Sequence, residues 1–248
     1  MKIGILGSGH IGKTLARTLS AAGHDVKVAN SRGPETIDAE TLANGARAVT
    51  TEQATQGVDV LIASIPFLRI PALAPLIAKM PAETVVIDTS NYYPHRDGKI
   101  GAIEAGLVES EWVAQQLGRP IVKALNAIGS DSFLRKAKPK GSPDRLTIPV
   151  AADRDADRKV GMSLVEDTGF DGFDAGTLAE SWRQQPGAPG YCTDLTREEM
   201  PAALASADRE RLPKRRDLAI AVVQERLGSS TKNPDAEYLV RLNRALCM

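Results

Sequence analysis

The chain has 248 residues, and 31 lysines and arginines balance 31 aspartates and glutamates, so its formal net charge is zero. Proteins that bind nucleic acid need an excess of basic residues to displace phosphate counterions, so this balance argues against that class. The two cysteines are too few for a disulfide scaffold. The cysteines and the three histidines also lack the spacing of metal ligands, so the sequence does not indicate a metal site.

The amino terminus lacks the pattern of a secretory signal peptide. No run of about 18 apolar residues predicts a helix that spans a membrane. We therefore expect a cytoplasmic protein without membrane attachment, whose partner is a small molecule rather than a nucleic acid. The length suits one or two domains.

The first 29 residues predict a complete βαβ unit. Residues 2–6 and 25–29 are typical of buried strands, and residues 11–22 carry apolar side chains at helical spacing. Between the first strand and the helix lies a GxGxxG motif, which comprises Gly7, Ser8, Gly9, His10, Ile11 and Gly12.

Each glycine of this motif has a physical role in binding a dinucleotide. Gly7 permits the tight turn, Gly9 lets the backbone approach a pyrophosphate, and Gly12 lets the helix pack closely on the strand. The backbone N–H groups at the start of the helix then face the phosphates. The alternative is a tight glycine turn that binds nothing.

The residues after the second strand predict which dinucleotide binds. An NAD site needs a carboxylate there for the ribose 2′-hydroxyl, whereas an NADP site has an arginine and small hydroxyl groups. This chain reads Asn30-Ser31-Arg32, and the first carboxylate is Glu35. Arg32 can form a charge-assisted bond to a 2′-phosphate and Ser31 can donate its hydroxyl, which predicts NADP(H). The alternative for Arg32 is a solvated surface arginine.

Alternating strands and helices continue along the chain. Strands are predicted at residues 47–50, 58–63, 84–88 and 120–125, and helices at about 34–44, 70–79 and 109–117. This alternation predicts an α/β fold, a doubly wound and mainly parallel Rossmann sheet. Ligands of such sheets bind outside the carboxyl ends of the strands, so segments 64–66, 89–91 and 126–128 are expected on the nicotinamide side. The candidate residues are Ser64, Ile65, Pro66, Ser90, Asn91 and Asn126. A purely structural turn is the alternative for each segment.

The last hundred residues are less regular. Residues 146–174 predict another strand, helix and strand, after a polar and basic segment, 130–145, that is either a solvated loop or a flap. The Pro- and Gly-rich segment 181–191, with Trp182, is either a lid or a fixed connector. Helices are expected at 197–207, 212–227 and 235–247.

We predict an NADP-binding Rossmann domain over 1–178 and a small, largely helical C-terminal lid or extension over 179–248. Leu239, Leu242 and Leu246 share a face on which a homodimer could form.

Several segments resemble the F420-dependent NADP oxidoreductase family. They are GSGHIGKTLARTLSAAGHDVKVANSR, IASIPF, IVKALNAI and a longer segment that ends in an Asp-Ala-Gly turn at residues 174–176. The resemblance covers roughly residues 1–181. It implies pyrophosphate contacts from Ser8, Gly9, His10 and Ile11, 2′-phosphate contacts from Ser31 and Arg32, and a nicotinamide ribose flanked by Ile65 and Ser90. The family's further basic residue beyond the Ser-Arg pair is missing here, where residues 33–36 read Gly-Pro-Glu-Thr.

Hydride transfer between NADPH and a deazaflavin or flavin needs two rings held together in a dry cleft rather than a strong side-chain acid. The sequence has no recognisable catalytic histidine or Tyr-Lys pair, and we assign no catalytic residue. It predicts an NADP(H)-dependent oxidoreductase whose acceptor is F420, a flavin or another small molecule. A non-catalytic, redox-sensing NADP(H)-binding module and a dehydrogenase or reductase of a small carbonyl or imine remain alternatives.

Overall fold

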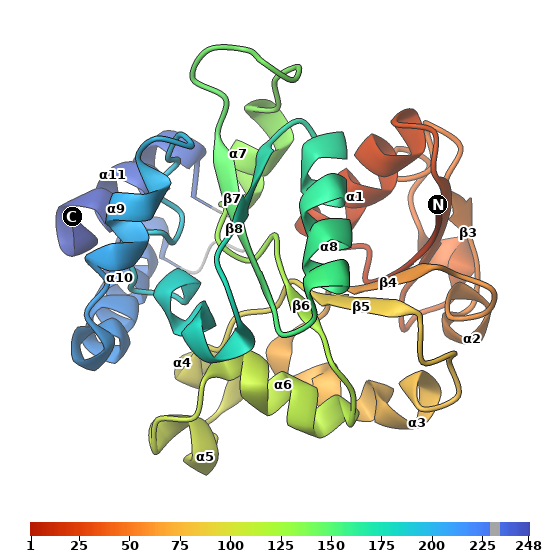
Figure 1. The fold of residues 1–248 in the computed structure, drawn as a ribbon, viewed down its shortest axis with the longest axis horizontal. Helices are drawn as coiled ribbons and strands as arrows, with labels where there is room; N and C mark the ends of the chain where they lie inside the picture. The colour runs from red at the N-terminus through yellow and green to blue at the C-terminus, as the bar shows by residue number, and fades with distance from the viewer. Residues whose placement is uncertain (229–233) are drawn as a thin grey trace.

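The computed structural model describes residues 1–228 and 234–248. Its eight strands form one sheet in the order β3-β2-β1-β4-β5-β6-β7-β8 (Figure 1). The strands are β1 (Lys2–Leu6), β2 (Asp25–Ala29), β3 (Arg47–Ala48), β4 (Val60–Ala63), β5 (Val85–Asp88), β6 (Val122–Lys123), β7 (Thr147–Ala152) and β8 (Asp171–Asp174). All neighbours pair in parallel except β6 and β7, which are antiparallel. The predicted doubly wound, mainly parallel Rossmann sheet is therefore confirmed.

The strand order reverses at β1, where two successive halves of the sheet meet. Gly4 pairs with Lys27 of β2 on one side and with Leu61 of β4 on the other. In open α/β sheets, the crevice outside the carboxyl ends of the strands at such a reversal is the usual ligand site. The glycine motif follows β1 directly and therefore lies at this reversal.

Helices cover both faces of the sheet because successive strand residues point to opposite sides. One face packs Ile3, Ile5 and Ile62 against α1 (His10–Ala21) and α8 (Asp155–Asp167). The other face packs Leu6 and Leu61 against α2 (Thr51–Ala54), η2 (Phe67–Leu73), α3 (Ala74–Ile77) and α6 (Glu109–Leu117). The apolar runs of the central strands are thus buried on both sides, as expected for a parallel sheet.

The remaining described elements are short, apart from two helices near the carboxyl terminus. They are η1 (Pro34–Thr36), α4 (Pro94–Asp97), α5 (Gly101–Glu104), α7 (Ser130–Arg135), η3 (Leu178–Gln184), α9 (Met200–Ala205), η4 (Arg209–Arg211), α10 (Leu212–Leu227) and α11 (Ala236–Cys247). In Figure 1, α9, α10 and α11 gather at the end of the molecule opposite β3. No helix of the described residues is long and apolar enough to cross a membrane.

The predicted helix at 34–44 is wrong. The segment contains only η1 and a series of turns, because the backbone is extended again at Ile37 and the Asp38 side chain accepts hydrogen bonds from the N–H and hydroxyl of Thr41. The predicted helix at 70–79 is also interrupted. Pro71 and Pro75 lack the N–H groups that a continuous helix needs, so η2 and α3 replace it.

Several further details differ from the prediction, and β6 is shorter than the predicted 120–125. β3 ends at Ala48, two residues early, because Thr50 caps α2 through reciprocal hydrogen bonds with Gln53. The polar segment 130–145 begins with α7, which was not predicted. The segment 181–191 is largely buried, and the Cys192 N–H donates to the Ala127 carbonyl oxygen at 2.9 Å. It therefore packs as a fixed connector.

Candidate functional site

The three glycines of the motif differ in what surrounds them. Gly7 has a φ of +112°, and a Cβ there would lie 2.0 Å from the carbonyl oxygen of Ser64. A Cβ on Gly12 would lie 2.0 Å from the carbonyl oxygen of Gly7, whereas a Cβ on Gly9 would meet nothing within 4 Å. Gly7 and Gly12 are therefore needed for packing, and Gly9 leaves space open at the start of α1.

The amino end of α1 has no side chain capping it. Gly9 occupies the N-cap position, and His10 and Ile11 are the first helical residues. The first turn also contains no acidic residue. The N–H groups of this turn, together with the helix dipole, favour an anion at the end of the helix.

Asn30 connects the glycine turn to the loop after β2. Its Nδ2 donates to the Ser8 hydroxyl at 3.1 Å and to the Thr36 hydroxyl at 3.0 Å. Its Oδ1 accepts from the Arg32 N–H at 2.9 Å. The sequence showed Asn30 only as a position where an NAD site would have a carboxylate. Asparagine side chains often accept a hydrogen bond from the backbone N–H two residues later, so an asparagine at the start of a loop is a turn signal.

Ser31 and Arg32 are both exposed on this loop. The Arg32 guanidinium makes no hydrogen bond or ion pair with any residue that the structure describes. An arginine that is fixed through its backbone but unpaired at its side chain is available to an anionic ligand. The predicted pair therefore lies at the carboxyl end of β2, on a loop joined to the glycine turn by Asn30.

The residues after β4 pack directly against the glycine turn. The Ser64 N–H donates to the Leu6 carbonyl oxygen at 2.8 Å, and the side chain of Ile65 approaches Gly7. Pro66 is exposed and precedes η2. The fold thus brings Ser64 and Ile65 together with the motif, as the carboxyl-end rule predicts.

A buried ion pair fixes the turn after β5. Lys123 and Asp88 are register partners on β6 and β5, and the Lys123 Nζ donates to the Asp88 carboxylate at 2.7 Å with both side chains fully buried. Lys123 also donates to the Ser90 carbonyl oxygen, and Asp88 accepts from the Ser90 N–H at 3.0 Å and from its hydroxyl at 2.6 Å. Sequence reasoning missed this role, although a charged residue at the end of each of two neighbouring apolar strands was visible.

Three amide side chains form a cluster next to this turn. Asn91 donates to the Asn126 carbonyl oxygen at 3.0 Å, and Asn126 donates back to the Asn91 side chain at 3.2 Å. Gln184 donates to the Asn126 side chain at 3.0 Å, and its backbone carbonyl accepts from the same side chain at 3.0 Å. The two predicted asparagines therefore do meet, and Gln184 of η3 joins them from the segment 181–191, although it was not among the predicted site residues.

The strand reversal at β1 and the glycine turn that follows it define a Rossmann-type dinucleotide-binding protein. A family model described as NADP oxidoreductase, coenzyme F420-dependent, matches residues 2–92. The Escherichia coli (strain K12) protein YjhV is 38% identical over 112 residues, which cover 44% of this chain and 76% of that protein. The chain belongs to the F420-dependent NADP oxidoreductase family and is an NAD(P)-dependent oxidoreductase.

Solved structures share the fold over most of the chain. The hypothetical protein SMa0349 from Sinorhizobium meliloti is 27% identical, with a TM-score of 0.68 over 79% of this chain and 96% of that protein. A protein described as an F420-dependent NADP reductase from Arthrobacter sp. FB24 is 19% identical, with a TM-score of 0.57 over 73% of this chain and 87% of that protein. The second similarity shows the common fold alone.

Proposed function

We propose that the chain transfers a hydride between NADP(H) and a small ring-type acceptor, F420 or a flavin. The observation that carries the choice of NADP(H) is the exposed guanidinium of Arg32 beside Ser31, which pairs with no described residue and follows β2 in a segment, 30–33, that contains no carboxylate. A 2′-phosphate would satisfy that guanidinium, whereas the hydroxyl of NAD would leave its charge without a partner.

The proposed site runs along the carboxyl edge of the sheet. The backbone of Ser8, Gly9, His10 and Ile11 would hold the pyrophosphate, and Ser64, Ile65, Pro66, Ser90, Asn91 and Asn126 would line the nicotinamide end. When bound, the nicotinamide ring supplies or accepts the hydride. The Lys123–Asp88 pair holds the Ser90 turn in place for it.

The side chains at the proposed nicotinamide end favour an acceptor that needs no proton from the protein. They are hydroxyl, amide and apolar groups, and the nearby Lys123 and Asp88 are already paired with each other. Such a site can exclude water and orient two rings, which is the main requirement of hydride transfer between them.

The division of the chain at residue 178 is part of this proposal. Residues 1–178 would carry the dinucleotide, and the extension over 179–248 would complete the acceptor side. Gln184 supports this arrangement because it joins Asn126 at the sheet edge.

Two measurements test the proposed function. Titration calorimetry should give clearly tighter binding for NADPH than for NADH, and equal affinities would contradict the role of Arg32. NADPH oxidation should then be followed with F420, FMN, FAD, ferric chelates and a panel of carbonyls and imines. Turnover with a deazaflavin or flavin is expected. Background rates with every acceptor would indicate the alternative, a redox-sensing module.

A further inference from the structure

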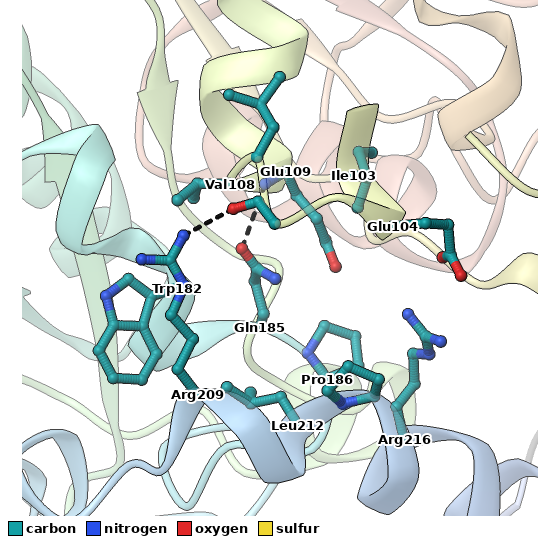
Figure 2. A pocket seen from close by; sticks show the side chains of 13 residues that line it. Ile103, Glu104, Val108, Glu109, Trp182, Gln185, Pro186, Arg209, Leu212 and Arg216 are labelled. Atoms are coloured by element: carbon teal, nitrogen blue, oxygen red, sulfur yellow. Dashed lines mark hydrogen bonds between the residues drawn. The ribbon is translucent and has the colours of Figure 1, made fainter. Parts of the chain in front are cut away.

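A cavity that does not include the glycine turn lies between the start of α6, the segment after η3 and the start of α10 (Figure 2). Its volume is about 230 Å³, which suits a small organic molecule. The lining contains two charged side chains that are almost fully buried, Glu109 at 1% and Arg216 at 7% exposure. Charged residues are rarely buried unless something pairs with them, so both need an explanation.

Arg216 presents unpaired donors to this cavity. Its Nε donates to Asp217 at 2.8 Å, but its two terminal nitrogens make no hydrogen bond to any residue in the described part of the chain. The guanidinium also lies over the Tyr92 ring, 5.4 Å from the ring centre, which fixes its orientation. Figure 2 shows it pointing toward the carboxyl groups of Glu104 and Glu109, yet it forms an ion pair with neither of them. Two parallel N–H groups of this kind match the two oxygens of a carboxylate.

Glu109 presents an acceptor to the same space. One carboxyl oxygen accepts from the Tyr92 N–H at 3.1 Å, and the side chain points into the cavity (Figure 2). Burial raises the pKa of Glu109 to about 7, with partial compensation from Lys123, the Tyr92 N–H and Arg216. A ligand with a hydrogen-bond donor, charged or neutral, would stabilise this carboxyl group.

The rest of the lining combines apolar side chains with polar groups that have partners. Gln185 accepts from the Glu109 N–H at 3.2 Å, and Arg183 packs on the Trp182 ring at 4.3 Å. Two further charged residues line the cavity and already have partners: Glu104 accepts from the Tyr92 hydroxyl at 3.0 Å, and Arg209 donates to the Gly106 carbonyl oxygen at 2.7 Å. The apolar side chains of the lining include Ile103, Leu107, Val108, Pro186 and Leu212. A pocket with a few polar groups on apolar walls can fix the orientation of a small ligand.

We propose that this cavity binds a small amino or hydroxy acid, whose carboxylate pairs with the terminal nitrogens of Arg216 and whose amine or hydroxyl donates to Glu109. The terminal nitrogens of Arg216 and the carboxyl group of Glu109 face the same cavity, and together they select a molecule that carries both a carboxylate and a hydrogen-bond donor. The proposal concerns binding alone and does not depend on the hydride transfer proposed above.

Four small probes test this chemistry on the full chain without any nucleotide. L-alanine and L-lactate carry both groups, propionate lacks the donor, and L-alaninamide lacks the carboxylate. Titration calorimetry should detect L-alanine, L-lactate or both, with propionate about tenfold weaker or more and L-alaninamide not binding. The better of the first two probes identifies the amino or the hydroxy acid as the source of the donor. Failure of both to bind, or equal binding of propionate, would overturn the proposal.

The variant Arg216→Met keeps the length of the side chain and removes its charge. It should lose binding of the best probe by about tenfold or more, while Lys214→Met, an exposed position on the same helix, should bind as the wild type does. Arg216→Lys keeps the charge without the paired donors and should give an intermediate affinity. Unchanged binding in Arg216→Met would refute the assignment, and the probe comparison in the wild type stands even if that variant does not fold.

Discussion

Replacing Glu109 with glutamine should stabilise the protein at alkaline pH and change little at acidic pH. The carboxyl group is fully buried, and this burial raises its pKa from 4.5 to about 7 despite the opposing effects of Lys123 and Arg216. Glutamine has nearly the same shape, and its side-chain carbonyl can still accept from the Tyr92 N–H. The substitution therefore removes the ionisation and keeps the hydrogen bond.

The sign and size of the effect follow from proton linkage. The folded protein binds the proton of Glu109 more tightly than the unfolded chain does. The protonated carboxyl group therefore favours folding, and this contribution to stability is lost when the pH is high enough to ionise Glu109 in both states. The wild type should lose stability from about pH 4.5 upward until the pH has passed the folded-state pKa of about 7. A pKa raised from 4.5 to about 7 corresponds to a total of about 3 kcal/mol, most of which falls between about pH 5 and pH 8.

Urea unfolding of the wild type, Glu109→Gln and Glu111→Gln at several pH values checks this prediction. The free energy of unfolding of Glu109→Gln should exceed that of the wild type by an amount that grows with pH, to about 3 kcal/mol near pH 8. Glu111 lies two residues further along α6 and is only partly buried, so its variant should follow the wild type. If all three curves have the same pH dependence, the buried carboxyl group does not carry the linkage.

Four other substitutions have defined outcomes. Arg32→Ala should weaken NADPH binding by about 1.5–3 kcal/mol and leave NADH binding unchanged, with Arg47→Ala as a control, as titration calorimetry can show. Gly9→Ala should weaken NADPH binding without loss of thermal stability, because a Cβ there has open space, whereas Gly12→Ala should lower the melting temperature because its Cβ would meet a backbone oxygen at 2.0 Å. Lys123→Met should lower the free energy of unfolding by about 3–5 kcal/mol, because it leaves the buried Asp88 carboxylate without its ion-pair partner. A midpoint of urea unfolding equal to that of the wild type would contradict this.

The parts of the fold that were predictable from the sequence have strong local patterns. The first βαβ unit combines an apolar strand, a glycine motif and helical spacing, and the structure places its elements within one residue of the prediction. The segment 34–44 lacks such agreement. Pro34 is compatible with the start of a helix, but the Asp38 side chain accepts a hydrogen bond from the Thr41 N–H and stabilises a turn instead.

The candidate site was predictable only where residues follow a strand. The carboxyl-end rule identified Ser64, Asn91 and Asn126, and the structure puts each at that edge. Gln184 could not be found this way, because it reaches Asn126 from 58 residues further along the chain and follows no strand. Arg216 could not be predicted either, because an arginine on a polar helix is expected to be exposed until the packing of that helix is known.

The amide of Gln184 also bears on the order in which the chain can assemble during synthesis. The backbone partners of the glycine turn lie within the first 64 residues, whereas the Asn126 side chain and the Ala127 carbonyl oxygen accept hydrogen bonds from Gln184 and Cys192. A ribosome-bound chain that stops short of residue 184 therefore leaves the edge of β6 without these partners. The end of the crevice at the glycine turn can form early, but the opposite end is completed only after most of the polypeptide has been translated.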